Sequence, residues 1–225
     1  AATPTLTGPG PGLSDAEAAA LTSTLTARAL AADWVVLAGS LPRGVDTDWY
    51  CDLISAVRTA APQARVAVDT SDAPMQAIGE NLESAAPDLI KPNGLELGQL
   101  TGTDGRELEE QAARGDYSGV VRAARDVVKQ GIAEVLVTLG GAGAVLVTAD
   151  GAWAATPPPA TVKSTVGAGD AALAGYLLGR TAGNSPADSL ARSVAYGTAA
   201  ASKQGTQFPR PEEIDIANTP VHSLA

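Results

Sequence analysis

Residues 164–177 read Ser-Thr-Val-Gly-Ala-Gly-Asp-Ala-Ala-Leu-Ala-Gly-Tyr-Leu, a polar, glycine-rich turn that runs into a segment of small residues typical of a helix. Glycine lets the backbone approach a ligand closely, and a helix start offers unpaired N–H groups and a dipole that favours negative charge. This combination is typical of an anion site, most often one for phosphate. Asp170 adds a carboxylate there, which could serve as general base for a hydroxyl that attacks phosphorus. In isolation, the simpler interpretation is that the aspartate only favours the helix N-terminus.

Composition narrows the class of protein. The 225 residues can form one domain with a sizeable core, and 45% of them are apolar, as in globular proteins. A net charge of −10 argues against a nucleic-acid partner. Because Cys51 is the single cysteine and His222 the single histidine, an intrachain disulfide, a cysteine metal cluster and a histidine metal cage are excluded. The sequence has no apolar run of membrane-span length and no recognisable secretory signal, so we expect a cytoplasmic enzyme without a membrane partner.

Short apolar runs alternate along the chain with amphipathic segments. The expected strands are Trp34–Ala38, Arg65–Asp69, Asp88–Ile90, Glu134–Thr138, residues 144–147 and a short edge strand from Trp153. The expected helices run from Ser14 to about Ala31, from about Thr47, from Pro74 to about Ser84, from Ser118 to Gln130, after Asp170, and from Ala187 to about Ser202. Residues 102–117 look irregular, and residues 209–225 look like a polar tail. Such alternation predicts an α/β fold with a mostly parallel sheet and helices on both faces.

Residues 91–97, Lys-Pro-Asn-Gly-Leu-Glu-Leu, follow the third expected strand. Lysine is a flexible point charge suited to phosphate, Asn93 can cap the next helix, and Glu96 lies one turn further on the same face. Taken alone, a capped helix with a surface lysine explains these residues. Asp69, at the end of the preceding strand, is either a site residue or a helix cap, and we favour the cap.

Together, residues 164–177 and 91–97 resemble two signatures of the ribokinase-like, or PfkB-type, carbohydrate kinases, in the order that this family has them. The resemblance implies an anion hole formed by Gly167, Ala168 and Gly169, with Asp170 as the catalytic base. It also implies a ribokinase-like α/β fold over residues 1–225, as a single kinase domain.

The same resemblance assigns the nucleotide and magnesium sites. It implies that Lys91 contacts nucleotide phosphates and that Asn93 and Glu96 organise Mg²⁺ through its waters. The segment after the strand Glu134–Thr138 would otherwise be read as a flexible hairpin. The resemblance makes it part of the ATP site, where the backbone of Thr138, Gly140 and Gly143 approaches the nucleotide. Weak candidates for the adenine pocket are Thr198, Ala201 and Lys203.

One part of the family pattern is missing from the chain. Residues 5–11 resemble a segment that normally lies well inside the family's sequence, after a region that carries a substrate aspartate, a sugar-binding motif and most of a β lid. We therefore expect a kinase domain that lacks its N-terminal strands and lid. The residues that bind the sugar stay unassigned, and a homodimer is a possibility for the full-length protein.

The activity implied by the resemblance is ATP- and Mg²⁺-dependent phosphoryl transfer to a hydroxyl of a phosphosugar. The first expectation is conversion of fructose 1-phosphate to fructose 1,6-bisphosphate. One alternative is a sister activity on tagatose 6-phosphate or fructose 6-phosphate. Another is a truncated chain that binds nucleotide but is catalytically impaired.

Overall fold

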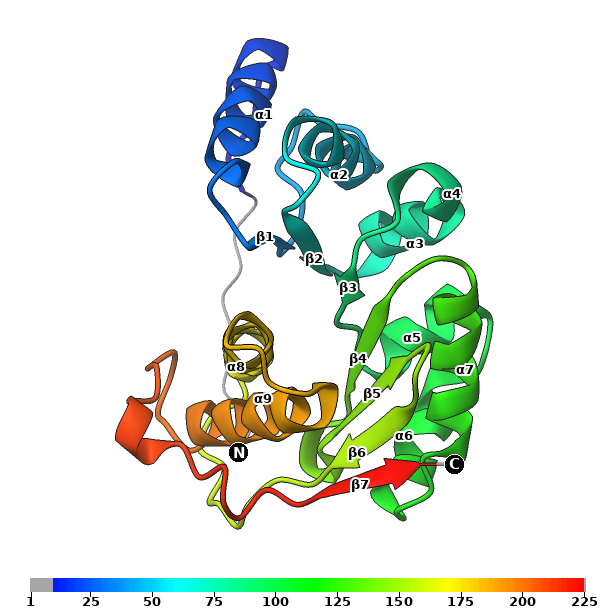
Figure 1. The fold of residues 1–225 in the computed structure, drawn as a ribbon, viewed down its shortest axis with the longest axis vertical. Helices are drawn as coiled ribbons and strands as arrows, with labels where there is room; N and C mark the ends of the chain where they lie inside the picture. The colour runs from blue at the N-terminus through cyan, green and yellow to red at the C-terminus, as the bar shows by residue number, and fades with distance from the viewer. Residues whose placement is uncertain (1–9, 225) are drawn as a thin grey trace.

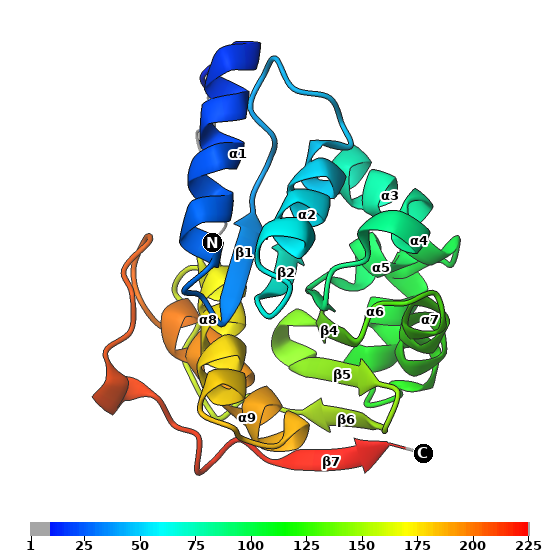
Figure 2. The same cartoon turned by 45° about the horizontal axis from the view of Figure 1, so that its top comes forward.

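The computed structural model describes residues 10–224 and shows a single seven-stranded sheet in the order β1-β2-β3-β4-β5-β6-β7 (Figures 1 and 2). Four strands pair in parallel: β1 (Trp34–Ala38), β2 (Arg65–Asp69), β3 (Leu89–Ile90) and β4 (Glu134–Thr138). Three further strands extend the sheet in antiparallel pairing: β5 (Ala144–Thr148), β6 (Ala152–Ala155) and β7 (Val221–Leu224). The expected α/β fold is confirmed, and the sheet is parallel across its first four strands and antiparallel at the three pairings beyond β4.

Helices cover both faces of this sheet (Figure 1). They are α1 (Asp15–Ala29), α2 (Trp49–Ala60), α3 (Asp72–Glu80), α4 (Leu82–Ala85), α5 (Gly94–Thr101), α6 (Gly105–Ala113), α7 (Ser118–Lys129), α8 (Ala168–Thr181) and α9 (Pro186–Ala201). Successive strand residues point to opposite faces: Val66 and Val68 join the core beneath α2 and α7, whereas Ala67 joins the core beneath α8 and α9. No helix between residues 10 and 224 combines the length and the apolar character that crossing a membrane requires.

The helix expected at Ser14 begins there, because Ser14 and Glu17 form the capping box that their spacing predicts. It ends at Ala29, two residues before the expected end. The continuous apolar run Trp34–Ala38 is typical of a strand buried on both faces, but β1 is buried on one face only. Its residues alternate, and Val36 leaves 44% of its surface exposed. A continuous apolar run thus identified the strand but not its surroundings.

Two segments that looked irregular are ordered elements. Within residues 102–117, α6 is capped by Asp104, whose carboxylate accepts from the N–H groups of Arg106 and Glu107. Leu108 and Ala112, four positions apart, are its buried face. Within residues 209–225, β7 pairs with β6, so the description of this segment as a polar tail is wrong for its last described residues. Residues 5–9, the larger part of the segment compared with the family's interior, lie outside the described residues.

Candidate active site

The glycine-rich turn ends in the left-handed conformation at Gly167, with φ 78° and ψ −1°, and α8 begins at the next residue. A side chain would strain this backbone, so glycine is favoured there. The Ala168 N–H donates weakly to the Thr165 carbonyl at 3.2 Å. Within residues 10–224, the N–H groups of Gly169 and Asp170 meet no acceptor. The free N–H donors at this helix start are therefore those of Gly169 and Asp170, whereas that of Ala168 is already engaged.

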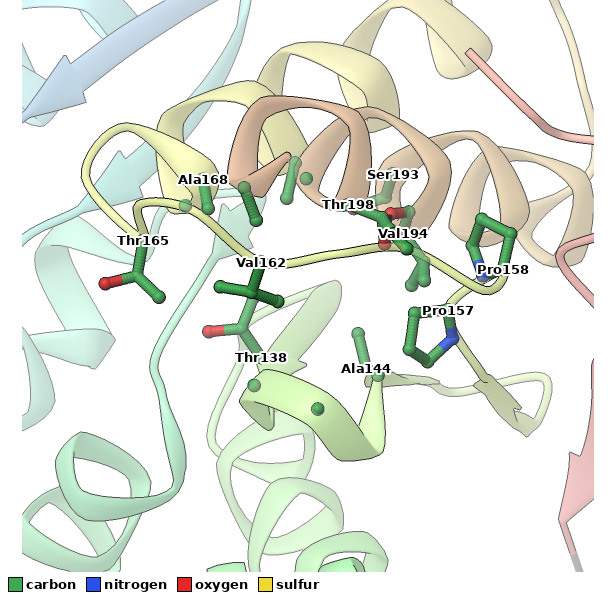
Figure 3. A pocket seen from close by; sticks show the side chains of 18 residues that line it. Thr138, Ala144, Pro157, Pro158, Val162, Thr165, Ala168, Ser193, Val194 and Thr198 are labelled. Atoms are coloured by element: carbon green, nitrogen blue, oxygen red, sulfur yellow. Dashed lines mark hydrogen bonds between the residues drawn. The ribbon is translucent and has the colours of Figure 1, made fainter. Parts of the chain in front are cut away.

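A cavity of about 430 Å³ opens beside this turn (Figure 3). Three segments form its walls: the turn between β4 and β5, the loop from Pro157 to Thr165, and the facing sides of α8 and α9. It is lined by Thr138, Gly140 and Gly143 of the predicted nucleotide site, by Ala168 and Gly169 of the predicted anion hole, and by the adenine-pocket candidates Thr198 and Ala201. Lys91 and Gly167 are not among its lining residues. Lys203 lies elsewhere, where it forms an ion pair with Glu213. The end of the cavity away from Ala168 is largely apolar and is formed by Pro157, Pro158, Ala144 and Val194 (Figure 3).

The β4–β5 connection is a fixed part of the cavity wall. It is a short 3₁₀ turn, Gly140–Ala142, closed by Gly143 at φ 89°. A Cβ at Gly143 would overlap the carbonyl oxygen of Ala155, so only glycine fits there. At the other end of the turn, the Thr138 N–H donates to the Pro92 carbonyl at 2.9 Å. This bond joins the predicted nucleotide turn directly to the segment of residues 91–97.

Lys91 is buried, which overturns the interpretation of a surface lysine. Its Nζ lies 3.1 Å from Asp69 Oδ2. A Cβ built on Gly169 would lie only 3.2 Å from the same Nζ, so the ammonium rests against the start of α8. The lysine thus connects the carboxyl end of β2 with the predicted anion hole.

Asp69 does not cap a helix, as the sequence led us to favour. The residue at the N-cap position of α3 is Ser71, and the Asp69 carboxylate pairs with Lys91 instead. Burial raises the pKa of Asp69, Lys91 lowers it, and the charge of Asp170 raises it again. Asp69 therefore belongs to the candidate site, the alternative that the sequence led us not to favour. The available signal was its place at the carboxyl end of a parallel strand, where open α/β sheets bind ligands.

Asn93 and Glu96 form a reciprocal capping box at the start of α5. Asn93 Oδ1 accepts from the Glu96 N–H at 2.8 Å, and Glu96 Oε2 accepts from the Asn93 N–H at 2.8 Å. Burial is the largest influence on the pKa of Glu96 and raises it, whereas the Asn93 hydrogen bond and Lys91 lower it. No protein donor in the described residues reaches Glu96 Oε1, which leaves this oxygen available to a cation or its waters.

Asp170 is exposed at the first turn of α8. It forms no ion pair with Lys91, whose partner within residues 10–224 is Asp69. Asp69, Lys91, Glu96 and Asp170 therefore converge on one edge of the sheet, beside a cavity and two free amides. This group combines hydrogen-bond donors that suit an anion with one exposed carboxylate, Asp170, for which the described residues provide no ion-pair partner.

Residues 10–213 match the pfkB family carbohydrate kinases, and the chain belongs to this family. Among curated relatives, the 1-phosphofructokinase of Rhodobacter capsulatus is 40% identical over 205 residues, which cover 91% of this chain and 59% of that protein. The 1-phosphofructokinase of Escherichia coli K12 is 39% identical over 147 residues, 65% of this chain and 42% of that protein. The chain thus spans less than two thirds of the length of either relative.

Solved structures confirm the ribokinase-like fold. Phosphofructokinase-2 from Escherichia coli in complex with potassium superposes with a TM-score of 0.80 at 29% identity, over 93% of this chain and 63% of that chain. A putative phosphofructokinase from Staphylococcus aureus also gives a TM-score of 0.80, at 24% identity, over 96% of this chain and 66% of that chain.

Proposed function

We propose that this chain carries the nucleotide site and the catalytic base of a kinase that phosphorylates fructose 1-phosphate. The reaction is ATP plus fructose 1-phosphate giving ADP, fructose 1,6-bisphosphate and a proton. The observation that carries the proposal is that the ammonium of buried Lys91 rests against Gly169, which lines the cavity and, like the adjacent Asp170, has a free amide. The 40% identity to a 1-phosphofructokinase supports the choice of sugar.

Each group has a defined part in the proposed transfer. Asp170 accepts the proton of the sugar 6-hydroxyl, whose oxygen then bonds to the γ-phosphorus while the bond from that phosphorus to the β-phosphate oxygen breaks. The amides of Gly169 and Asp170, together with the α8 dipole, stabilise negative charge on the transferred group. Lys91, whose ammonium rests against Gly169, neutralises phosphate oxygens at the same helix start.

The cavity suggests how ATP lies. With its phosphates at the glycine turn, the nucleoside extends toward the apolar end formed by Pro157, Pro158, Ala144 and Val194 (Figure 3). Thr138, Gly140 and Gly143 form the wall along the way. A flat base suits such an apolar slot, because mostly apolar surfaces with few polar groups bind cofactors well.

Magnesium fits the residues that are present. In the described part of the chain, no three His, Cys, Asp or Glu side chains gather around one metal position. Mg²⁺ usually keeps several waters and binds through one or two carboxylates plus substrate phosphates. Glu96, with one free carboxylate oxygen, and Asn93 would hold it in that way. When bound, the ion would supply charge neutralisation to the phosphates.

A second acceptor, fructose 6-phosphate, is favoured by one specific observation. A structure of phosphofructokinase-2 from Escherichia coli in complex with fructose-6-phosphate superposes with a TM-score of 0.74 at 29% identity, over 87% of this chain. Tagatose 6-phosphate is a third acceptor of the same chemical type. A panel of these three sugars, assayed with the full protein by coupled release of ADP, tests the choice: the highest kcat/KM should be found with fructose 1-phosphate.

The chain itself should bind ATP and ADP in the presence of Mg²⁺, because the walls of the cavity lie within residues 138–201. Isothermal titration calorimetry tests this, with adenosine as the ligand that lacks phosphates. Affinity should fall from ATP to adenosine, since the amides and Lys91 recognise phosphate. Equal heats for ATP and adenosine would contradict the placement of the phosphates.

Replacement Glu96→Gln should raise the Mg²⁺ concentration needed for half-maximal activity and leave stability nearly unchanged. Glutamine keeps the capping box with Asn93, because either side chain can accept the N–H bond, but it removes the charge that attracts the cation. Glu107→Gln, in the first turn of α6, is the matched control. A Mg²⁺ titration of Glu96→Gln that overlays the wild type would show that Glu96 only caps α5.

The cellular setting and assembly belong to the same proposal. We expect a cytoplasmic kinase whose partners are ATP and a small phosphosugar. A tetrameric inhibited form of phosphofructokinase-2 from Escherichia coli has been solved, and it superposes on this chain at a TM-score of 0.73. We expect self-association here as well, as a homodimer, which sedimentation of the full protein would test.

A further inference from the structure

Asp69 and Lys91 meet because of the register of two short parallel strands. Val68 of β2 lies opposite Ile90, the last residue of β3, so the residues that follow this pair are Asp69 and Lys91. The Lys91 N–H also donates to the Val68 carbonyl at 3.1 Å, which continues the pairing by one residue. The sheet itself therefore brings the carboxylate and the ammonium together, with 3.1 Å between Oδ2 and Nζ.

This ion pair is largely withdrawn from water. The side chain of Lys91 is 6% exposed and that of Asp69 is 16% exposed. A buried ammonium is costly unless it is paired, so the lysine strongly favours the geometry in which it contacts a carboxylate. Exposed pairs lack this constraint, because water competes for both partners.

The position of the ammonium matters because of what lies on its other side. Nζ rests against Gly169, where even an added Cβ would approach it to 3.2 Å. Lysine has a flexible four-carbon stem and no preferred direction for its charge. A fixed carboxylate behind the ammonium supplies that direction, and phosphoryl transfer depends chiefly on positioning and charge stabilisation.

Two other carboxylates lie near this lysine. Lys91 lowers the pKa of Glu96, and Asp170 directly follows Gly169, against which the ammonium rests. Within residues 10–224, however, Asp69 is the one carboxylate within 4.0 Å of Lys91 Nζ. The lysine is therefore kept away from the proposed base, which stays free to accept a proton.

We propose that Asp69 is a positioning residue that holds the Lys91 ammonium against Gly169, where it faces the phosphoryl group and does not pair with Asp170. The role rests on the proposed function, since it assumes that phosphate binds at the α8 turn. It assigns to Asp69 an action through Lys91 and no contact with substrate.

A double-mutant cycle on the full protein tests this action, using Asp69→Asn, Lys91→Met and the double variant. Asp69→Asn should lower kcat on the order of tenfold with a smaller change in the KM for ATP, because a misplaced charge costs most in the transition state. In the Lys91→Met background, the same substitution should change kcat less than twofold, about the limit of additivity for independent sites. An equal effect in both backgrounds, or no effect in either, would overturn the proposal.

A binding measurement separates this proposal from the choice of sugar. By calorimetry with Mg²⁺ and no acceptor, Asp69→Asn should weaken ATP binding and leave adenosine binding unchanged. In the Lys91→Met background, Asp69→Asn should no longer change the affinity for ATP. If the wild type binds ATP but phosphorylates none of the three sugars, the proposed choice of sugar is wrong. The calorimetric measurement of ATP binding still decides the role of Asp69. Unchanged ATP affinity in Asp69→Asn would count against it.

Two further variants guard against a misleading result from Asp69→Asn, such as a loss of folding. Asp126→Asn removes the partner of Lys129 from an exposed ion pair of the same type, whose side chains are 73% and 62% exposed, and should leave kcat and ATP affinity unchanged. If Asp69→Asn fails to fold, Asp69→Glu carries the same test. It keeps the charge but moves the carboxylate by one methylene, so it should fold and still lose turnover.

Discussion

Replacement of Asp170 by asparagine should lower kcat about a hundredfold or more, the usual scale for loss of a general base. Asparagine keeps the size of the side chain and its place at the start of α8, but it cannot accept the proton of the sugar hydroxyl. Asp170 is exposed, so no buried partner is lost and the melting temperature should barely change. The measurement is steady-state ADP release by the full protein with saturating sugar.

A matched control exists on the neighbouring helix. Asp188 occupies the first turn of α9, as Asp170 occupies that of α8, and accepts a hydrogen bond from Ser185. Asp188→Asn removes a helix-start carboxylate without touching the cavity, so its kcat should equal that of the wild type. If Asp170→Asn keeps near-normal turnover, then Asp170 is only a favourable residue at a helix start, and the base lies elsewhere.

The parts of the site that could be predicted from the sequence are those whose residues lie close together in the chain. The turn at Gly167–Gly169 and the capping box of Asn93 and Glu96 each depend on residues within a few positions of one another. Local backbone rules determine their conformation, because glycine permits the left-handed turn and an Asn-x-x-Glu pattern satisfies the first amides of a helix. Their roles toward ATP and Mg²⁺ remain proposals that the measurements above address.

The features that were missed depend on contacts between distant segments. For Asp69, at the end of a strand, the sequence left a site residue and a helix cap as alternatives, and we favoured the cap. Its partner Lys91 is 22 positions away in sequence and is brought next to it only through strand register. The strand β7 has a weak sequence signal, and its conformation comes from backbone pairing with β6. The exposed Val36 shows the same limit, since the burial of a strand depends on what packs over it.

The second large effect concerns stability. Glu134, at the start of β4, accepts hydrogen bonds from Arg180 Nη2 at 2.7 Å and Nε at 3.1 Å, and from the Tyr176 hydroxyl at 2.8 Å. Its side chain is 11% exposed and that of Arg180 is 20% exposed. Burial and the charge of Glu134 raise the pKa of Tyr176, so its hydroxyl stays protonated and donates. This network holds α8, the helix that begins at the proposed anion hole, against β4 of the sheet.

Glu134→Ala should destabilise the fold by about 3–5 kcal/mol, because it leaves a largely buried guanidinium without its carboxylate. For a chain of this size, that loss corresponds to a fall of roughly 10 °C in melting temperature. Asp126→Ala, which breaks the exposed pair with Lys129, should cost less than about 1 kcal/mol. Thermal and urea unfolding of both variants give the comparison. Equal melting temperatures would mean that packing of Leu173, Tyr176 and Leu190 in the core holds α8 in place without the ion pair.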